Sequence, residues 1–378
     1  MPHDYLIHVF VLGAATSAAL APPRRPQVLA RAAFLAGMVV NEVPHLVLLL
    51  LAISTVAAVG GGELGTDPLS LVLLVAAAAT ATMLLVVLRR AGQAPAVVDD
   101  ALRAAGVDAA RGYRGWWHVA LTPFPFQPWT VERLRNLRYG QHRRQRLDVL
   151  RRRDRPTGGP VLVYFHGGGY FSGSKNWEAR GLLHHFAERG WVCISASYRL
   201  RPRAGFEEHL ADAHAAMAWA RAHAHEHGGN STKVVLAGSS AGAHLTSLYA
   251  LASTPEERPA AAVCLYGYYG RYYDRGAGEK VPSSPFALDA AGAPAFLIAH
   301  GSLDTYTPAS TARALAEKVK AQSSNPVIHV ELPGGQHAFD LVRSWRLSAV
   351  IGALGALAAH LQLDPRPAAA PVDVEERR

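Results

Sequence analysis

Residues 69–88 read LSLVLLVAAAATATMLLVVL and contain no charged side chain, and Arg89 and Arg90 follow directly. At 1.5 Å per residue, an α-helix of this length spans the ~30 Å hydrocarbon core of a bilayer. A soluble domain seldom buries a helix that is this long and apolar on every side. The run therefore predicts a transmembrane helix, and the rest of the chain has to be arranged around it.

Two further apolar runs precede this one. Residues 43–60 are long enough for a second span, and the turn-rich residues 61–68 between the two spans predict a helical hairpin. Residues 5–21 form a third, weaker candidate. A signal peptide is the alternative, but it would carry a Lys or Arg before its apolar core, and neither precedes this run. We expect residues 1–92 to be a membrane region with two or three transmembrane helices. Glu42 and His45, at the edge of the second span, could form an intramembrane polar site, but we expect them to reach toward the membrane interface.

Basic residues predict the orientation of these helices. Arg24, Arg25 and Arg31 lie between the first and second runs, whereas the loop between the second and third carries Glu63 and Asp67 instead. Loops that are rich in Lys and Arg stay on the cytoplasmic side. The pattern predicts a multi-pass membrane protein whose following domain lies on the cytoplasmic side.

The net charge of +9 is concentrated in residues 133–155, which hold ten arginines. These arginines have two interpretations, solvated strand edges and turns or a contact with anionic lipid headgroups. No zinc-finger, RNA-recognition or helix-turn-helix signature accompanies them. Nucleic acid is therefore not an expected partner.

Short strand-like runs alternate with helix-like runs from residue 131 onward. This alternation predicts a mostly parallel sheet with helices on both faces, over residues 131–363. Cys193 and Cys264 lie within two of the strand-like runs and are expected to be buried free thiols. The strand-like runs are 161–165, 192–196, 234–237, 262–265, 295–299 and 327–332, after two antiparallel leading strands at 137–139 and 146–150; the helix-like runs are 179–188, 209–224, 241–252, 309–320 and 345–361.

Two segments flank this predicted domain. Residues 93–130 combine a helical stretch with a run rich in aromatic residues and proline, TPFPFQPW, and are expected to form cap or linker helices. Trp116, Trp117, Phe124 and Phe126 in this segment are candidates to cap a pocket. Residues 364–378, rich in proline and alanine and then charged, are expected to be a disordered tail.

The stretch VVLAGSSAGAHL contains the pattern Gly-x-Ser-x-Gly between a predicted strand and a predicted helix. In that context the pattern is typical of a nucleophile elbow, in which a serine is exposed on a sharp strand-to-helix turn. The spacing selects Ser240 rather than Ser239.

The stretch VLVYFHGGGYFSGSK places Gly167, Gly168 and Gly169 after a strand. Consecutive glycines let backbone N–H groups approach a substrate. Together with the N–H of Ala241, they are expected to form an oxyanion hole. A phosphate cradle is excluded, because no Gly-Lys-Ser/Thr follows. The preceding His166 is expected to anchor the loop and to take no part in proton transfer.

A nucleophile elbow requires an acid and then a base further along the chain. Asp304 and His337 each follow a predicted strand, and the carboxyl ends of strands are where open α/β sheets build their sites. We expect His337 to accept the proton of Ser240 and Asp304 to orient His337. Asp340 is a rival acid, and His300 is a rival base that breaks the chain order.

Three histidines in HAHEHGG, at positions 223, 225 and 227, resemble metal ligands. Their spacing does not match the His-Glu-x-x-His pattern, and histidines at the end of a helix suit its negative dipole. No metal and no cofactor is expected.

Together, HGGG, the pattern GSSAG and the later Asp and His resemble the hormone-sensitive-lipase-like esterases, the bacterial family IV of the α/β-hydrolase fold. Over about residues 130–361 the chain is most similar to actinobacterial membrane-anchored carboxylesterases, including YGQHRRQRLDVL and SYRLRP. The resemblance implies a catalytic triad of Ser240, Asp304 and His337. It also implies a cap that N-terminal helices build over the acyl pocket. Many relatives read Gly-Asp-Ser-Ala-Gly-Gly, whereas Ser239 and Ala243 stand at two of those positions here.

The predicted activity is the hydrolysis of short- to medium-chain or lipid-derived acyl esters through an acyl-enzyme, with a lipophilic ester as the substrate. An amidase or deacetylase with the same triad is the alternative. A ligand-binding module without catalysis is a third reading, but it would require a missing triad member.

Overall fold

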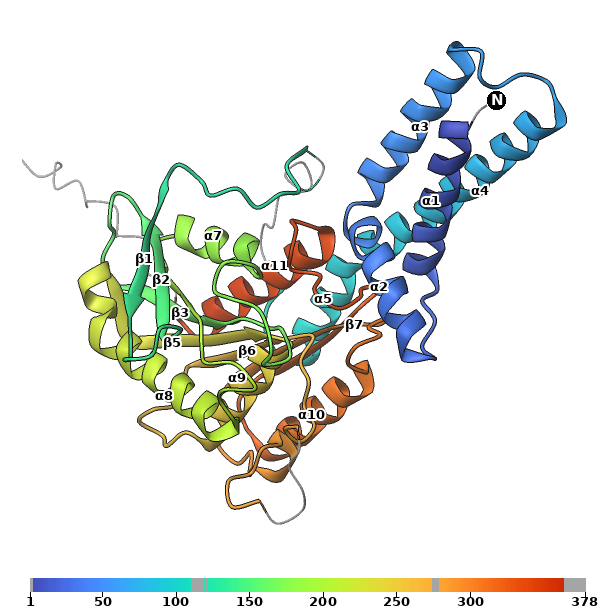
Figure 1. The fold of residues 1–378 in the computed structure, drawn as a ribbon. Helices are drawn as coiled ribbons and strands as arrows, with labels where there is room; N and C mark the ends of the chain where they lie inside the picture. Colours follow the sequence, from blue (N-terminus) through green and yellow to red (C-terminus); the bar gives the residue numbers. More distant parts are fainter. Residues whose placement is uncertain (1–2, 110–118, 120, 274–278, 364–378) are drawn as a thin grey trace, which may run out of the picture.

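The computed structural model describes residues 3–109, 119, 121–273 and 279–363. The predicted tail 364–378, Trp116 and Trp117 lie outside the described residues. Figure 1 shows two parts, a sheet covered by helices and a narrower helical bundle that projects from it. The bundle contains α1 (His3–Leu20), α2 (Gln27–Glu42), α3 (Pro44–Gly60) and α4 (Pro68–Gly92).

The sheet has eight strands in the order β1-β2-β4-β3-β5-β6-β7-β8. β1 and β2 are antiparallel to their neighbours, and every other pairing is parallel, so the predicted mostly parallel α/β sheet is confirmed. The strands are β1 (Val131–Arg138), β2 (Arg146–Arg152), β3 (Gly159–Phe165), β4 (Val192–Ala196), β5 (Gly229–Ser239), β6 (Ala261–Leu265), β7 (Ala295–Gly301) and β8 (Val327–Leu332).

Helices cover both faces of the sheet, because the central strands are apolar on both sides. One core layer joins the strands to α5 (Ala94–Ala104), α7 (Arg180–Glu188) and α11 (Trp345–His360). The opposite face is covered by α8 (Phe206–His223), α9 (Ala241–Ala252) and α10 (Ala309–Gln322). Cys193 and Cys264 are buried free thiols within the strands, as predicted.

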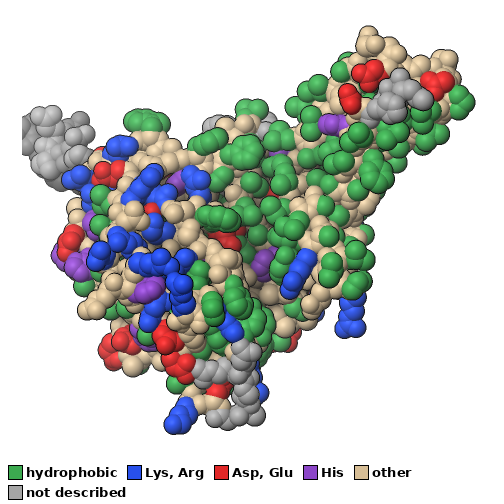
Figure 2. All heavy atoms as spheres, viewed as in Figure 1, with side chains coloured by type: hydrophobic (Ala, Val, Ile, Leu, Met, Phe, Trp, Pro, Cys, Tyr) green, Lys and Arg blue, Asp and Glu red, His purple; other side chains and the backbone are tan. Residues whose placement is uncertain are grey.

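The bundle differs from the sheet in where its apolar side chains lie. α1, α3 and α4 pack on one another, yet large side chains such as Phe10, Val56 and Val75 remain 69–74% exposed. In Figure 2 the projecting bundle is largely hydrophobic on its surface, whereas Lys and Arg gather over the sheet domain. Among the described residues, the helical stretch Pro68–Ala104, which comprises α4 and α5, is long and apolar enough to cross a membrane, with a mean hydropathy of 2.7 in its most apolar window.

Two features of the bundle differ from the sequence predictions. Residues 27–42, for which the sequence predicted no helix, form α2, which meets α3 at a bend of 88°. Glu42 was expected to reach toward the interface. It is buried instead, and Glu42 Oε1 lies 3.1 Å from Nη1 of Arg346 on α11. A buried carboxylate needs such a partner, and tertiary packing supplies it.

Residues 93–130, between the bundle and the sheet, contain α5 and then an aromatic stretch. α5 packs into the core beside α11 and β8. Phe126 and Trp129, in the aromatic stretch, lie next to residues of α7 and α11. The N–H of Arg343, just before α11, donates to Pro123 O of the same stretch at 2.6 Å. The division of the chain at residues 92 and 130 stays a prediction.

Candidate active site

Ser240 lies at the turn between β5 and α9, at the carboxyl end of a central strand. Its backbone has φ 53° and ψ −115°, a region that side chains rarely adopt. A Cβ on Gly238 would overlap the carbonyl of Gly242, and a Cβ on Gly242 would overlap the carbonyl of Phe165. Both glycines are therefore required for the chain to turn this sharply and expose the serine.

A line of hydrogen bonds joins the three residues that the sequence singled out. Ser240 Oγ lies 2.9 Å from His337 Nε2, and His337 Nδ1 lies 2.7 Å from Asp304 Oδ2. In this arrangement the hydroxyl donates to Nε2 and the Nδ1–H donates to the carboxylate. The three side chains come from loops after β5, β7 and β8, whose carboxyl ends meet at one edge of the sheet.

Asp304 is held rigidly and stays ionised. Its Oδ1 accepts the N–H groups of Tyr306 and Thr307 at 2.8 and 2.9 Å. Burial would raise the pKa of this carboxyl, but contacts with His337 and His300 outweigh burial and hold its pKa well below the ordinary value. Asp304 therefore offers a fixed negative charge to the imidazole.

The rival acid and the rival base have other partners. Asp340 Oδ2 accepts a hydrogen bond from the Ser239 hydroxyl at 2.8 Å, and Asp340 Oδ1 accepts one from the Tyr266 hydroxyl. His300 Nε2 donates to Thr307 O at 2.9 Å and lies 3.3 Å from Asp304. Asp340 and His300 therefore bind residues that surround the triad, and neither belongs to the line of hydrogen bonds that includes Ser240.

The glycine loop after β3 reaches the nucleophile. A Cβ on Gly167 would lie 3.0 Å from the Cβ of Ser240, so no side chain fits between them. Gly168 and Gly169 both have positive φ, at 101° and 60°. Ala241 begins α9, and the N–H groups of a first helical turn lack an acceptor within the helix.

Gly167 departs from its predicted role. Its N–H donates to Oε2 of Glu178, a partly buried residue that was not among the candidates from the sequence. An N–H that is already paired in this way is not free to bind a developing oxyanion. The donors that remain from the predicted set are Gly168, Gly169 and Ala241. Nδ1 of His166 donates to the carbonyl of Gly167 at 2.7 Å, which fits the predicted anchoring role.

Glu178 belongs to a second group of polar side chains under the elbow. The Tyr164 hydroxyl lies 2.8 Å from Ser239 Oγ and 3.3 Å from Glu178 Oε2. Burial, and then the charge of Asp340, raises the pKa of Glu178 to about 8, and burial also raises the pKa of Asp340. The pair therefore holds at least one proton at neutral pH. Of this group the sequence singled out Asp340, as a rival acid, and Ser239, as a departure from the resembled family, but gave no signal for Glu178.

Aromatic rings surround the histidine. The ring of Tyr306 stacks on His337 with a centroid distance of 5.2 Å, and Tyr266 lies edge-on at 4.7 Å. The ring centroid of Phe34, from α2 of the bundle, lies 4.9 Å from that of Tyr306 and 6.3 Å from that of His337. A residue more than 200 positions before the nucleophile thus forms part of the site's wall.

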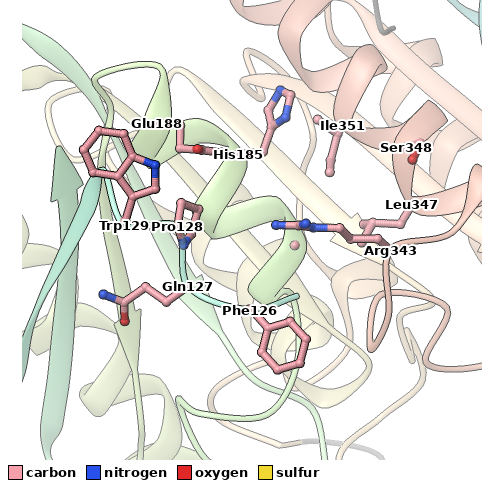
Figure 3. A pocket seen from close by; sticks show the side chains of 11 residues that line it. Phe126, Gln127, Pro128, Trp129, His185, Glu188, Arg343, Leu347, Ser348 and Ile351 are labelled. Atoms are coloured by element: carbon pink, nitrogen blue, oxygen red, sulfur yellow. The ribbon is translucent and has the colours of Figure 1, made fainter. Parts of the chain in front are cut away.

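The aromatic segment after α5 lines a different cavity, of about 470 Å³. Figure 3 shows Phe126 and Trp129 on one side of this cavity and Arg343 of the loop before α11 on the other. None of the three residues Ser240, Asp304 and His337 is among the described residues that line it. Phe126, a predicted pocket cap, therefore lies at this separate cavity.

Comparisons with known proteins agree with this geometry. Residues 147–281 match the BD-FAE family. The chain is 34% identical to the probable carboxylic ester hydrolase LipM of Mycobacterium tuberculosis, over 68% of this chain and 71% of that protein. It is 35% identical to the esterase LipC of the same organism, over 55% and 60% of the two chains.

Solved structures give the same result. A propionate-bound esterase from Thermogutta terrifontis superposes with a TM-score of 0.54 at 26% identity, over 63% of this chain and 97% of that chain. The same enzyme phosphorylated by paraoxon gives a TM-score of 0.55, over 65% and 99%. The fold, the order of the motifs and these relatives together confirm the resemblance seen in the sequence, and the chain belongs to the hormone-sensitive-lipase-like esterase family of the α/β-hydrolases.

Proposed function

We propose that this protein is a carboxylic ester hydrolase in which Ser240 is the nucleophile, His337 the general base and acid, and Asp304 the residue that orients His337. The observation that carries the proposal is the hydrogen-bonded line from Ser240 Oγ through His337 to Asp304, at 2.9 and 2.7 Å. The relatives named as esterases and carboxylic ester hydrolases support it.

The geometry supports an acyl-enzyme mechanism. Ser240 Oγ attacks the ester carbonyl while its proton passes to His337 Nε2, and the imidazolium is stabilised by the ionised Asp304. The N–H groups of Gly168, Gly169 and Ala241 stabilise the negative oxygen of the tetrahedral intermediate. His337 then protonates the leaving alcohol. A water molecule, activated by the same histidine, releases the carboxylic acid and restores Ser240.

The bundle supports a proposal about location. We propose that α1, α3 and α4 are embedded in a bilayer as a multi-pass anchor, because their outward side chains are apolar and Pro68–Ala104 can span it. Arg89 and Arg90 lie at the end of α4 that is nearer the sheet, whereas Glu63 and Asp67 lie at the far tip. By the positive-inside rule, the hydrolase domain then lies on the cytoplasmic side. A lipophilic ester is the substrate that best fits an enzyme anchored this way.

A reactive-serine probe tests the triad. A fluorophosphonate should label the wild-type protein at Ser240 and should fail to label Ser240→Ala. Ser239→Ala is the matched control, because this neighbouring serine faces Tyr164 and Asp340 rather than His337. It should still be labelled. Labelling of Ser240→Ala at the wild-type level would refute the proposal, and equal turnover of matched anilides and esters would change the reaction to amide hydrolysis.

A further inference from the structure

Helix α2 is apolar on two opposite faces. One face buries Ala30, Phe34 and Gly37, with Phe34 against Tyr306 of the sheet domain and Gly37 against α1. The opposite face leaves Leu35 65% and Val39 53% exposed. Exposed apolar side chains that lie together on one face of a helix indicate a surface that protein or lipid covers. The described protein covers only one side of α2.

The direction of α2 indicates what covers the other side. α2 and α3 meet at 88°, so a helix α3 that crosses a bilayer leaves α2 parallel to the bilayer surface. Arg24 and Arg25 precede α2, and Arg31 in its first turns is exposed. Basic side chains at headgroup level next to an apolar face are typical of helices that lie in the membrane interface.

The inner face of α2 is fixed to the catalytic machinery. Phe34 packs on Tyr306 and lies beside His337. At the end of α2, Arg346 Nη1 donates to Asn41 O at 2.7 Å, and Arg346 Nε donates to Pro333 O at 3.0 Å. Pro333 begins the loop that carries His337. One buried guanidinium therefore ties the end of α2 to the loop of the base.

We propose that α2 is an interfacial helix whose outer face lies among the acyl chains of the bilayer and whose inner face walls the entrance to Ser240. The enzyme then takes esters that reside in the bilayer, with their acyl chains already at the depth of α2. This inference rests on the proposed membrane anchor and esterase activity. It adds the route by which the substrate arrives.

Turnover of two substrates in phosphatidylcholine proteoliposomes tests the route. The soluble substrate is p-nitrophenyl butyrate, and the bilayer-resident one is p-nitrophenyl palmitate in the same vesicles. The double variant Leu35→Gln/Val39→Gln should lower the palmitate-to-butyrate rate ratio at least tenfold, with the butyrate rate within twofold of wild type. The control is Val56→Gln/Val59→Gln, which removes two exposed apolar side chains from α3 and should leave the ratio unchanged.

The butyrate rate separates the possible outcomes. If wild type cleaves butyrate and the ratio does not change in the α2 variant, the esterase activity stands and the route is refuted. An equal change in the α3 control also refutes the route. If wild type cleaves neither ester, the proposed function itself fails.

Depth measurement gives a second test that does not depend on activity. Because Cys193 and Cys264 are buried, a bimane label can be attached selectively to Leu35→Cys. Brominated lipids should quench this label strongly. The same label at Phe286→Cys, an exposed position of the sheet domain, should not be quenched. Equal quenching at the two positions, or none at position 35, would overturn the proposal.

Discussion

Two carboxylate sites flank the nucleophile, and their chemistry is opposite. Asp304 contacts two histidines and has a pKa well below its ordinary value. Glu178 and Asp340 lie under the elbow near each other, and their pKa values are raised. Asp304 and Asp340 are both buried and Glu178 is partly buried, so burial alone does not distinguish the two sites. The partner does, because an imidazole stabilises the ionised form of an acid and a second carboxylate destabilises it.

Asp304→Asn should cause the largest loss. The amide cannot hold His337 in the tautomer that accepts the proton of Ser240, and kcat should fall by roughly 10³- to 10⁴-fold. KM should change little, because Asp304 lies behind the imidazole. Steady-state kinetics with a soluble ester checks this, and circular dichroism verifies the fold. A loss of less than tenfold would show that Asp304 is not the orienting acid.

Asp340→Asn provides the direct contrast. Asparagine keeps the shape and one acceptor oxygen for Tyr266 and Ser239, so the variant loses about one charge-assisted hydrogen bond, roughly 1–2 kcal/mol. We expect this cost mainly in the free energy of unfolding, measured by urea denaturation, and only a several-fold decrease in kcat. A loss of kcat equal to that of Asp304→Asn would make Asp340 the catalytic acid.

The sequence predicted the residues of the first site, but of the second site it named only Asp340, as a rival acid, and missed Glu178. Ser240, Asp304 and His337 follow strands in the chain order that the fold requires, so local pattern and topology were enough to select them. Glu178 lies in an irregular stretch between β3 and α7, and nothing in its neighbours shows that it meets the N–H of Gly167. Only the folded chain brings it under the elbow.

The helical bundle likewise has features that the sequence predicted and contacts that it did not. Apolar length predicted α1, α3 and α4, since it is a property of each segment alone. The packing of Phe34 on Tyr306 and the pairing of Glu42 with Arg346 join residues about 270 and 304 positions apart. Such pairs depend on how the bundle docks on the sheet domain, which a single sequence does not specify.

Glu178→Gln tests the raised pKa. Folding raises the pKa of Glu178 from 4.5 to about 8, so the folded protein binds more protons than the unfolded one between these values. Wild-type stability from this group is therefore greatest below about pH 4.5 and is lost as the pH rises toward 8, by up to ~1.4 kcal/mol per pH unit. Glutamine keeps an acceptor for Gly167 and does not titrate.

The Tm difference between variant and wild type isolates this effect from other titrating groups. Between pH 5 and pH 8, Tm of Glu178→Gln minus Tm of wild type should increase steadily in favour of the variant. Differential scanning calorimetry at four pH values is sufficient. A difference that is constant with pH would show that Glu178 is ionised in the folded protein.

His300→Gln should have the smallest effect. His300 Nε2 and His337 Nδ1 lie 3.3 and 2.7 Å from Asp304 Oδ2. His300 donates its Nε2–H to Thr307 O. Of these two histidines, His337 is the one whose other ring nitrogen lies 2.9 Å from Ser240 Oγ. Replacing His300 removes about one buried hydrogen bond, worth ~1 kcal/mol, or about fivefold in rate if all of it acts on the transition state. His337→Gln is the matched control and should lose roughly 10⁴-fold in kcat, because no other group can accept the serine proton. Similar losses in the two variants, measured on the same soluble ester, would mean that the two histidines share proton transfer and that the assignment of His337 alone is wrong.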